Sequence, residues 1–263
     1  MNMKIPFVNR HPTVAVIRLS GAIGSGARAL NDASLGPVIE KAFAKKPAAV
    51  ALVINSPGGS PAQSSLIGSR IRRLADEKEI PVHAFVEDVA ASGGYWLASS
   101  ADDIWIDHSS VVGSIGVIAA TFGAHEFLAR QGFERRVHTA GKSKSMLDPF
   151  RPEKKEDVKR LEGILSQLHD TFIAQIKARR GDKLSTDVDL FTGEFWLGQN
   201  AVDLGLADGI GHAAPKLKEL YGDKVRFAKY GRKRGLFQRF GGQMIDDAIG
   251  AIEERAAYAR FGL

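Results

Sequence analysis

Three turns rich in glycine, each expected to follow a strand, are the first candidates for chemistry. They are Ser56–Gly59, Ser92–Gly94 and Gly113–Gly116. Glycine lets the backbone approach a ligand closely and direct its N–H groups at it. Ser92 stands where an expected strand turns into an expected short helix, and the N-terminus of that helix would stabilise a developing oxyanion. Taken alone, a Ser-Gly-Gly sequence indicates no more than a tight turn.

A serine hydroxyl becomes an efficient nucleophile when a nearby base takes its proton. The candidate bases are seven histidines, several carboxylates, and the lysines Lys142 and Lys144. A lysine acts as a base where burial or a polar pocket lowers its pKa, and Ser–Lys pairs are a known variant of the catalytic triad. In an extended segment Lys142 and Lys144 share a face, so spacing does not choose between them. In a solvated loop neither would act.

A Ser-His-Asp arrangement is the alternative. His108 and His138 could serve it together with Asp102, Asp103 or Asp107. Solvated or structural histidines are the simpler interpretation, and the Gly-x-Ser-x-Gly elbow of the α/β-hydrolases is absent. No cluster of His, Asp and Glu has metal-ligand spacing, and no nucleotide-binding glycine pattern follows a strand. We therefore expect no metal and no cofactor.

The elements that must position these turns alternate between strands and helices. Ala48–Asn55 is apolar nearly throughout, which is typical of a strand buried on both faces of a parallel sheet. Ser60 is placed to cap a helix that begins at Pro61. The alternation predicts right-handed crossovers and an α/β layered domain. The other expected elements are strands Val14–Leu19, Val82–Val86 and Ile104–Ile106, and helices Asn31–Ala44 and Glu153–Arg180.

The composition excludes several kinds of catalytic and metal site. The chain has 263 residues and no cysteine, so thiol nucleophiles, disulfides and thiolate metal sites are excluded. The longest stretch without a charged residue or histidine, Ser109–Ala124, is short for a membrane span and contains three glycines. The N-terminus lacks the apolar run of a signal peptide, so we expect a cytoplasmic protein. Residues 224–240 contain seven Lys or Arg and no acid, a patch that predicts peripheral contact with an anionic membrane or another partner.

Five segments, in order, resemble the signature blocks of the signal peptide peptidase A (protease IV) family. They cover roughly residues 14–211, and five ordered blocks are far more specific than one. The segments are INSPGGS (54–60), DVAASGGYWLAS (88–99), VGSIGV (112–117), GKSKSMLDPFRP (141–152) and GQNAVDLGLADGIG (198–211).

The resemblance implies a crotonase/Clp-protease fold and peptide-bond hydrolysis by a Ser–Lys dyad. Ser92 matches the nucleophile and Lys144 the general base, whereas Lys142 does not. Gly59 matches a glycine whose N–H contributes to the oxyanion hole, and the N–H of Gly93 is the natural second donor. Ser114 matches a serine that orients the lysine amine. The resemblance also implies a homo-oligomer, because a single unit of this fold usually needs neighbours to complete its groove.

The sequence departs from the family in two ways. No N-terminal anchor is readable, and a single copy of the catalytic unit is present where larger members carry two. Both departures bear on the substrate and leave the dyad intact. We expect a peptidase domain over residues 1–221 and a basic, amphipathic helical extension over residues 222–263.

The expected activity is endopeptidase cleavage of peptides or unfolded segments, with apolar residues near the cut. One alternative is a crotonase-type acyl-CoA enzyme, which needs a Glu or Asp acid/base and has no use for Lys144. The other is a non-catalytic scaffold or membrane-surface adaptor. The sequence indicates no specific nucleic acid as a partner.

Overall fold

The computed structural model describes residues 11–26, 29–141, 143–231 and 255–263. The chain divides into two compact units. Unit 1 consists of residues 1–115 and 175–263, and unit 2 consists of residues 116–174. Each unit is a body with its own internal contacts.

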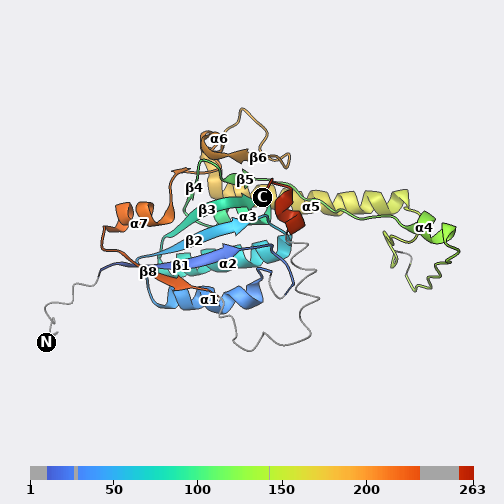
Figure 1. The fold of residues 1–263 in the computed structure, drawn as a ribbon, viewed down its shortest axis with the longest axis horizontal. Coiled ribbons are helices and arrows are strands. Elements are labelled where there is room, and N and C mark those ends of the chain that lie inside the picture. The colour runs from blue at the N-terminus through green and yellow to red at the C-terminus, as the bar shows by residue number, and fades with distance from the viewer. Residues whose placement is uncertain (1–10, 27–28, 142, 232–254) are drawn as a thin grey trace. The chain divides into compact units, whose positions relative to one another are not determined.

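Unit 1 is built on a mostly parallel sheet with the strand order β6-β5-β3-β2-β1-β8 (Figure 1). Strand β4 pairs with β3 and with β7, and the antiparallel pair is β5 with β6. The carboxyl ends of the parallel strands therefore meet at one edge, where ligands bind in sheets of this kind. The strands are β1 (Thr13–Ser20), β2 (Ala49–Ser56), β3 (Val82–Ala91), β4 (Asp103–Ile106), β5 (Val111–Gly113), β6 (Phe195–Leu197), β7 (Gly209–Ile210) and β8 (Arg226–Tyr230).

The centre of the sheet is apolar on both faces. Along β2, residues Ala49, Val50, Ala51 and Leu52 are all inaccessible to solvent. Alternate residues face different neighbours: Ala49 and Ala51 pack in one cluster that includes Leu217 of a covering helix. This arrangement confirms the strand expected from the uninterrupted apolar run of the sequence.

Helices connect the parallel strands and cover the sheet. Asn31 caps α1 by accepting a hydrogen bond from the N–H of Ser34. Ser60 caps α2 in the same way, and Pro61 is the first residue of that helix, as the sequence predicts. The helices are α1 (Asp32–Ala44), α2 (Pro61–Lys78), α3 (Gly93–Ser99), α4 (His125–Arg130), α5 (Lys155–Arg180), α6 (Gly198–Asp203) and α7 (Ala213–Tyr221).

The expected α/β layered fold with parallel strands and crossover helices is confirmed. Residues 226–230, inside the expected C-terminal extension, form β8, which pairs in parallel with β1. The extension thus contributes an edge strand to the sheet of unit 1. Its residues 232–254, where most of the expected amphipathic helix falls, lie outside the described residues. The boundary at residue 222 stays a prediction.

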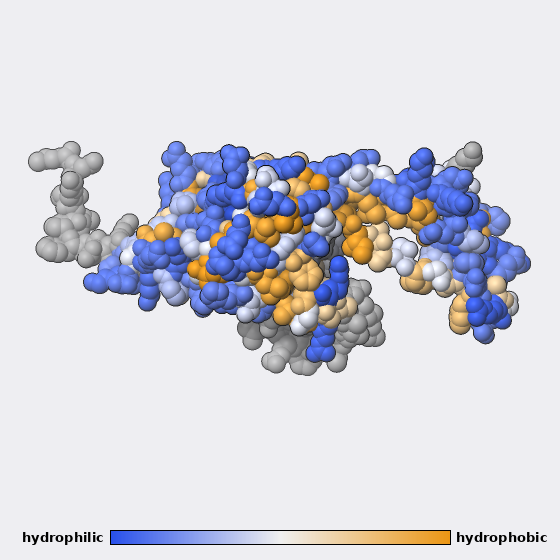
Figure 2. All heavy atoms as spheres, turned by 90° about the horizontal axis from the view of Figure 1, so that it is seen from above, coloured by the Kyte–Doolittle hydropathy of each residue, from blue (hydrophilic) through white to orange (hydrophobic). Residues whose placement is uncertain are grey.

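Unit 2 contains α4 and most of α5. Its exposed large apolar side chains include Ile118, Phe122, Phe127 and Phe133, each between 63% and 69% exposed. Figure 2 shows a largely hydrophilic surface on which hydrophobic residues are exposed in places. Among the described helices, none is both long and apolar enough to span a membrane.

Candidate active site

Ser92 occupies a strained turn between β3 and α3. Its φ of 52° and ψ of −121° lie in a region that residues with a Cβ rarely adopt. The turn is held on both sides, because the N–H of Ser92 donates to the carbonyl of Gly113 (2.8 Å) and its carbonyl accepts from Trp96 (3.0 Å). The residue is half-buried, and within unit 1 its hydroxyl makes no hydrogen bond to a described residue. Backbone strain of this kind is characteristic of functional sites.

The loop after β2 lies directly against this turn. A Cβ added to Gly58 would stand 2.9 Å from the Cβ of Ser92 and 2.7 Å from the nitrogen of Gly93. A Cβ on Gly59 would stand 2.0 Å from the carbonyl oxygen of Ile23. Both glycines also have positive φ, at 97° and 141°. Glycine is therefore required at both positions, by space and by backbone conformation.

Two backbone N–H groups beside Ser92 are free to bind an anion. A Cβ built on Gly93 would lie 3.4 Å from the nitrogen of Gly59, so the two residues are close. Neither N–H donates to another of the described residues, although the N–H of the neighbouring Ser60 donates to the carbonyl of Ile23 (2.8 Å). Gly93 is also the first residue of α3, whose orphan N–H groups favour negative charge. The pair has the character of an oxyanion-binding site.

Ser114 lies at the end of the strand that neighbours Ser92. Ala91 and Gly113 are partners in the β3–β5 ladder, so the residues that follow them leave the sheet side by side. Ser114 is half-buried, has a φ of 52°, and donates its N–H to the carbonyl of Glu194 (2.6 Å). Unit 1 thus brings together four of the five expected site residues, namely Ser92, Gly93, Gly59 and Ser114.

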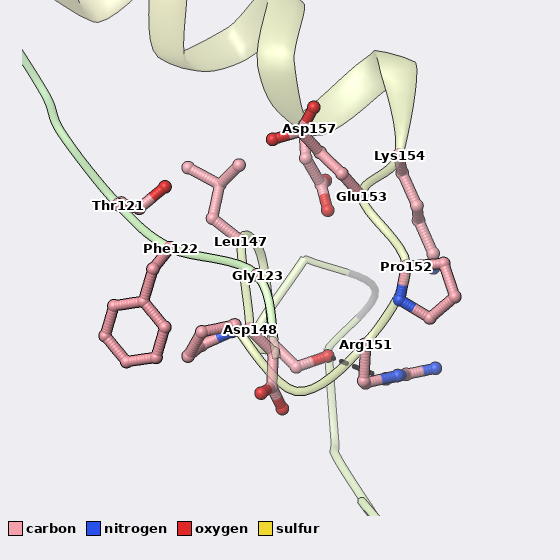
Figure 3. A pocket seen from close by; sticks show the side chains of 12 residues that line it. Thr121, Phe122, Gly123, Leu147, Asp148, Arg151, Pro152, Glu153, Lys154 and Asp157 are labelled. Atoms are coloured by element: carbon pink, nitrogen blue, oxygen red, sulfur yellow. Dashed lines mark hydrogen bonds between the residues drawn. The ribbon is translucent and has the colours of Figure 1, made fainter. Parts of the chain in front are cut away.

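Lys144 belongs to unit 2 and is exposed, on a turn where its N–H donates to the carbonyl of Gly141 (3.2 Å). Side-chain contacts hold the following segment, residues 145–151. Arg135 forms an ion pair with Asp148 (3.1 Å), and Arg151 donates to the hydroxyl of Ser145 (3.2 Å). A small hollow in unit 2 is lined by this segment (Figure 3). Its rim includes Phe122, Leu147 and Pro152, which lie within unit 2 as well.

Asp148 is the anchor of that segment. The N–H of Phe150 and the Arg135 guanidinium hold the pKa of the Asp148 carboxyl below its usual value of 3.8. Arg135 also lies over the ring of Phe150, with 5.5 Å between its guanidinium carbon and the ring centroid. Because Lys144 and Ser92 belong to different units, the pairing of the two side chains stays a prediction.

The histidines expected for the Ser-His-Asp alternative pair with none of the expected carboxylates in the described residues. His108 and His138 are exposed, and neither is hydrogen-bonded to Asp102, Asp103 or Asp107. Those carboxylates have other partners: Asp102 binds Arg72, Asp103 binds His83, and Asp107 binds His212. Described residues likewise contain no group of three side chains able to hold a metal ion.

One polar network was not anticipated. His83 is 6% exposed, and its Nδ1 lies 2.9 Å from the Asp103 carboxylate while its Nε2 lies 2.7 Å from the Tyr221 hydroxyl. Burial, and then the negative charge of Asp103, raise the pKa of Tyr221. His83 is the second residue of β3 and Ser92 follows the end of that strand, about 30 Å away at 3.3 Å per residue. The network joins β3, β4 and α7. In the sequence it is indicated only by a polar residue near the start of β3 and another at the start of β4.

Comparisons with known proteins find one family model that matches more than half of the chain. The family model described as "Peptidase family S49" matches residues 75–224, a span that contains Ser92, Ser114 and Lys144. A protein of Brucella melitensis biotype 1 named "Na(+)/H(+) antiporter NhaA" is 47% identical over 95% of this chain and 37% of its own length. "Probable protease SohB" of Haemophilus influenzae is 33% identical over 80% of this chain and 59% of its own length.

A third relative is "Serine protease SPPA, chloroplastic" of Arabidopsis thaliana. It is 30% identical over 75% of this chain and 30% of its own length. The chain therefore spans less than two thirds of the length of each of these three relatives. The antiporter name describes a protein of which this chain resembles only a part.

Proposed function

Because the chain belongs to peptidase family S49, we propose that it is a serine peptidase in which Ser92 is the nucleophile and Lys144 the general base. The family match agrees with the resemblance to signal peptide peptidase A that the sequence blocks carry. The observation that supports the proposal most is local to unit 1. A strained, half-buried serine lies beside two backbone N–H groups that have no other acceptor among the described residues.

The reaction is acyl transfer in two stages. The neutral amine of Lys144 takes the proton of Ser92, whose Oγ attacks the carbonyl carbon of the peptide bond. The carbonyl oxygen becomes an oxyanion between the N–H groups of Gly59 and Gly93. The bond to nitrogen then breaks, the leaving amine takes the proton from Lys144, and an ester to Ser92 remains. Lys144 next removes a proton from water, which attacks the carbonyl carbon of the ester. The bond to Ser92 Oγ then breaks, Oγ takes the proton back from Lys144, and the acid product leaves.

Lys144 must be uncharged to act as a base. Its side chain is exposed, and an exposed ammonium is well solvated. In the proposal, the bound peptide or a second copy of the chain excludes solvent water from the Lys144 amine. Ser114 would orient the amine through its hydroxyl.

The proposed substrates are peptides or unfolded segments with apolar residues near the cut. The proposed assembly is a homo-oligomer, which the exposed Phe122, Phe127 and Phe133 of unit 2 support, since large exposed apolar groups are typical of interaction surfaces. The basic stretch 224–240 is proposed to contact anionic membranes peripherally, although its residues 232–240 lie outside the described ones.

Labelling of the serine with a fluorophosphonate tests the dyad. Wild type should be labelled, and Ser92→Ala and Lys144→Ala should not. Lys142→Ala is the matched control, because this lysine stands two residues from Lys144 and has no role in the proposal. Equal labelling of the Ser92→Ala variant, or loss of labelling in Lys142→Ala but not in Lys144→Ala, contradicts the assignment.

A further inference from the structure

The C-terminal residues 255–263 cover an apolar surface at the end of β3. That surface consists of Val89, Ala91 and Val111, which are 0%, 0% and 5% exposed, and Tyr258 and Phe261 pack against it. Figure 1 shows the short C-terminal helix near the carboxyl ends of β2 and β3. We call residues 255–263 the C-terminal segment. Both it and the surface belong to unit 1.

Two aromatic side chains form the described contacts of the C-terminal segment with the sheet. The Tyr258 hydroxyl donates to the carbonyl of Asn55 (2.6 Å), and the Phe261 ring packs edge-on against Phe195 with centroids 5.4 Å apart. Residues three apart lie on the same face of a helical turn, so both rings face the sheet. The rest of the segment is largely exposed, including Arg255 and Ala259. Few buried contacts hold the segment, which is the condition for reversible local opening.

The covered surface and the Asn55 carbonyl belong to strand ends that lead into the candidate site of unit 1. Asn55 is the last residue but one of β2 and stands three residues before Gly58, and Ala91 immediately precedes Ser92. Val111 is in the ladder with Val89, two residues before Gly113, whose carbonyl holds the N–H of Ser92. The C-terminal segment thus lies over the last residues of the strands that deliver the nucleophile and the oxyanion-binding groups.

We infer that the C-terminal segment occupies a substrate subsite, and that this subsite accepts an aromatic side chain of the peptide substrate. The inference rests on the proposed peptidase function. The walls of the subsite are small or branched apolar residues, with Phe195 at one side. The carbonyl of Asn55 accepts a hydrogen bond from a phenol hydroxyl. A peptide with Phe or Tyr near the cut competes with Phe261 and Tyr258 for the same contacts.

Competition of this kind has a defined kinetic signature. The apparent affinity for substrate falls by the fraction of molecules in which the subsite is open. Removal of both aromatic side chains should therefore lower KM for a peptide containing Phe or Tyr by about three- to tenfold. The value of kcat should not change, because none of the substituted residues contacts the reacting atoms.

The test compares the full-length double variant Tyr258→Ala/Phe261→Ala with the control Arg255→Ala/Ala259→Ser, which alters exposed residues of the same segment. Each variant and wild type are assayed with two fluorogenic peptides, one with Phe near the cut and one with Ala in its place. A fall in KM only for the Phe peptide, and only in the aromatic double variant, supports the inference. An unchanged KM, or the same fall in the control, overturns it.

A binding measurement separates this inference from the peptidase proposal. A fluorescein-labelled peptide RAAYARFGL, which copies residues 255–263, should bind the double variant by fluorescence polarisation and bind wild type several-fold more weakly. A copy with both aromatic residues replaced by Ala should bind neither. Equal binding of the two peptides overturns the docking even if both proteins hydrolyse substrate. Absence of hydrolysis and of fluorophosphonate labelling in wild type refutes the peptidase proposal, and the polarisation result then decides the docking alone.

Discussion

Gly58→Ala should disable the site without unfolding the protein. A Cβ at this position stands 2.7 Å from the nitrogen of Gly93 and from the carbonyl oxygen of Ala91, whereas ordinary contacts begin near 3.4 Å. The Ser92 turn and the loop must therefore separate by about 0.7 Å. A displacement approaching 1 Å of a reacting group costs on the order of 10²-fold in rate, similar to the loss of one oxyanion donor.

Gly222→Ala is the matched control for this variant. Gly222 has a φ of 89°, close to the 97° of Gly58, but a Cβ there meets nothing within 4 Å. Both alanines carry the strain of positive φ, about 1 to 3 kcal/mol, and should lower the melting temperature by a few degrees. Steric displacement of Ser92 occurs only in Gly58→Ala.

Peptide hydrolysis and thermal unfolding are the two measurements. Gly58→Ala should lose about 10²-fold in kcat/KM, and Gly222→Ala should keep the wild-type value. The reasoning is refuted if Gly58→Ala is folded and retains more than a third of wild-type kcat/KM. It is also refuted if both variants lose activity equally, because strain rather than displacement would then be responsible.

Two further predictions concern stability. Tyr221→Phe removes the hydroxyl that His83 Nε2 contacts and leaves a buried nitrogen unpaired. The free energy of unfolding, measured by urea titration, should fall by about 1 to 3 kcal/mol, and kcat should not change. A loss of kcat in a variant that is still fully folded would contradict the structural role of this network. Burial tends to raise the pKa of Asp208, but hydrogen bonds from Arg180 and Lys183 outweigh it and hold the pKa below 3.8. A depressed carboxyl pKa adds stability that is present above the unfolded pKa and lost as pH falls through the folded value, so acid should destabilise wild type below about pH 4. Asp208→Asn should be less stable than wild type at pH 7 and should lose less free energy of unfolding between pH 7 and pH 3, as urea unfolding at the two pH values will measure. If the variant loses as much stability in acid as wild type does, groups other than Asp208 are responsible.

Local features of the fold could be predicted from the sequence because they depend on neighbouring residues. The apolar run ending at Asn55 indicates a buried strand, since polar residues would face an apolar layer on either side. Ser60 and Pro61 indicate a helix start through one side-chain hydrogen bond and one fixed φ. The Ser-Gly-Gly sequence likewise indicates a turn, and Ser92 does lie in one.

The strand β3 and the edge strand β8 show the limit of such patterns. The expected strand Val82–Val86 continues to Ala91, through the polar Glu87 and Asp88, and its register with β2 shifts between Ile54 and Ser56. Residues 226–230 are basic and were expected in an extension, yet they pair with β1. Edge strands tolerate charged side chains because one face or edge stays in water.

What the sequence determined by itself is the order of the elements, the turns between them and the residue types available for catalysis. Only the tertiary structure decided which of these residues meet: Gly58 lies against Ser92, and Tyr258 reaches the carbonyl of Asn55 across 203 positions of the chain. The physical reason is that periodicity and capping depend on contacts a few residues apart. Contacts between distant segments depend on sheet register and on side chains packing together in three dimensions.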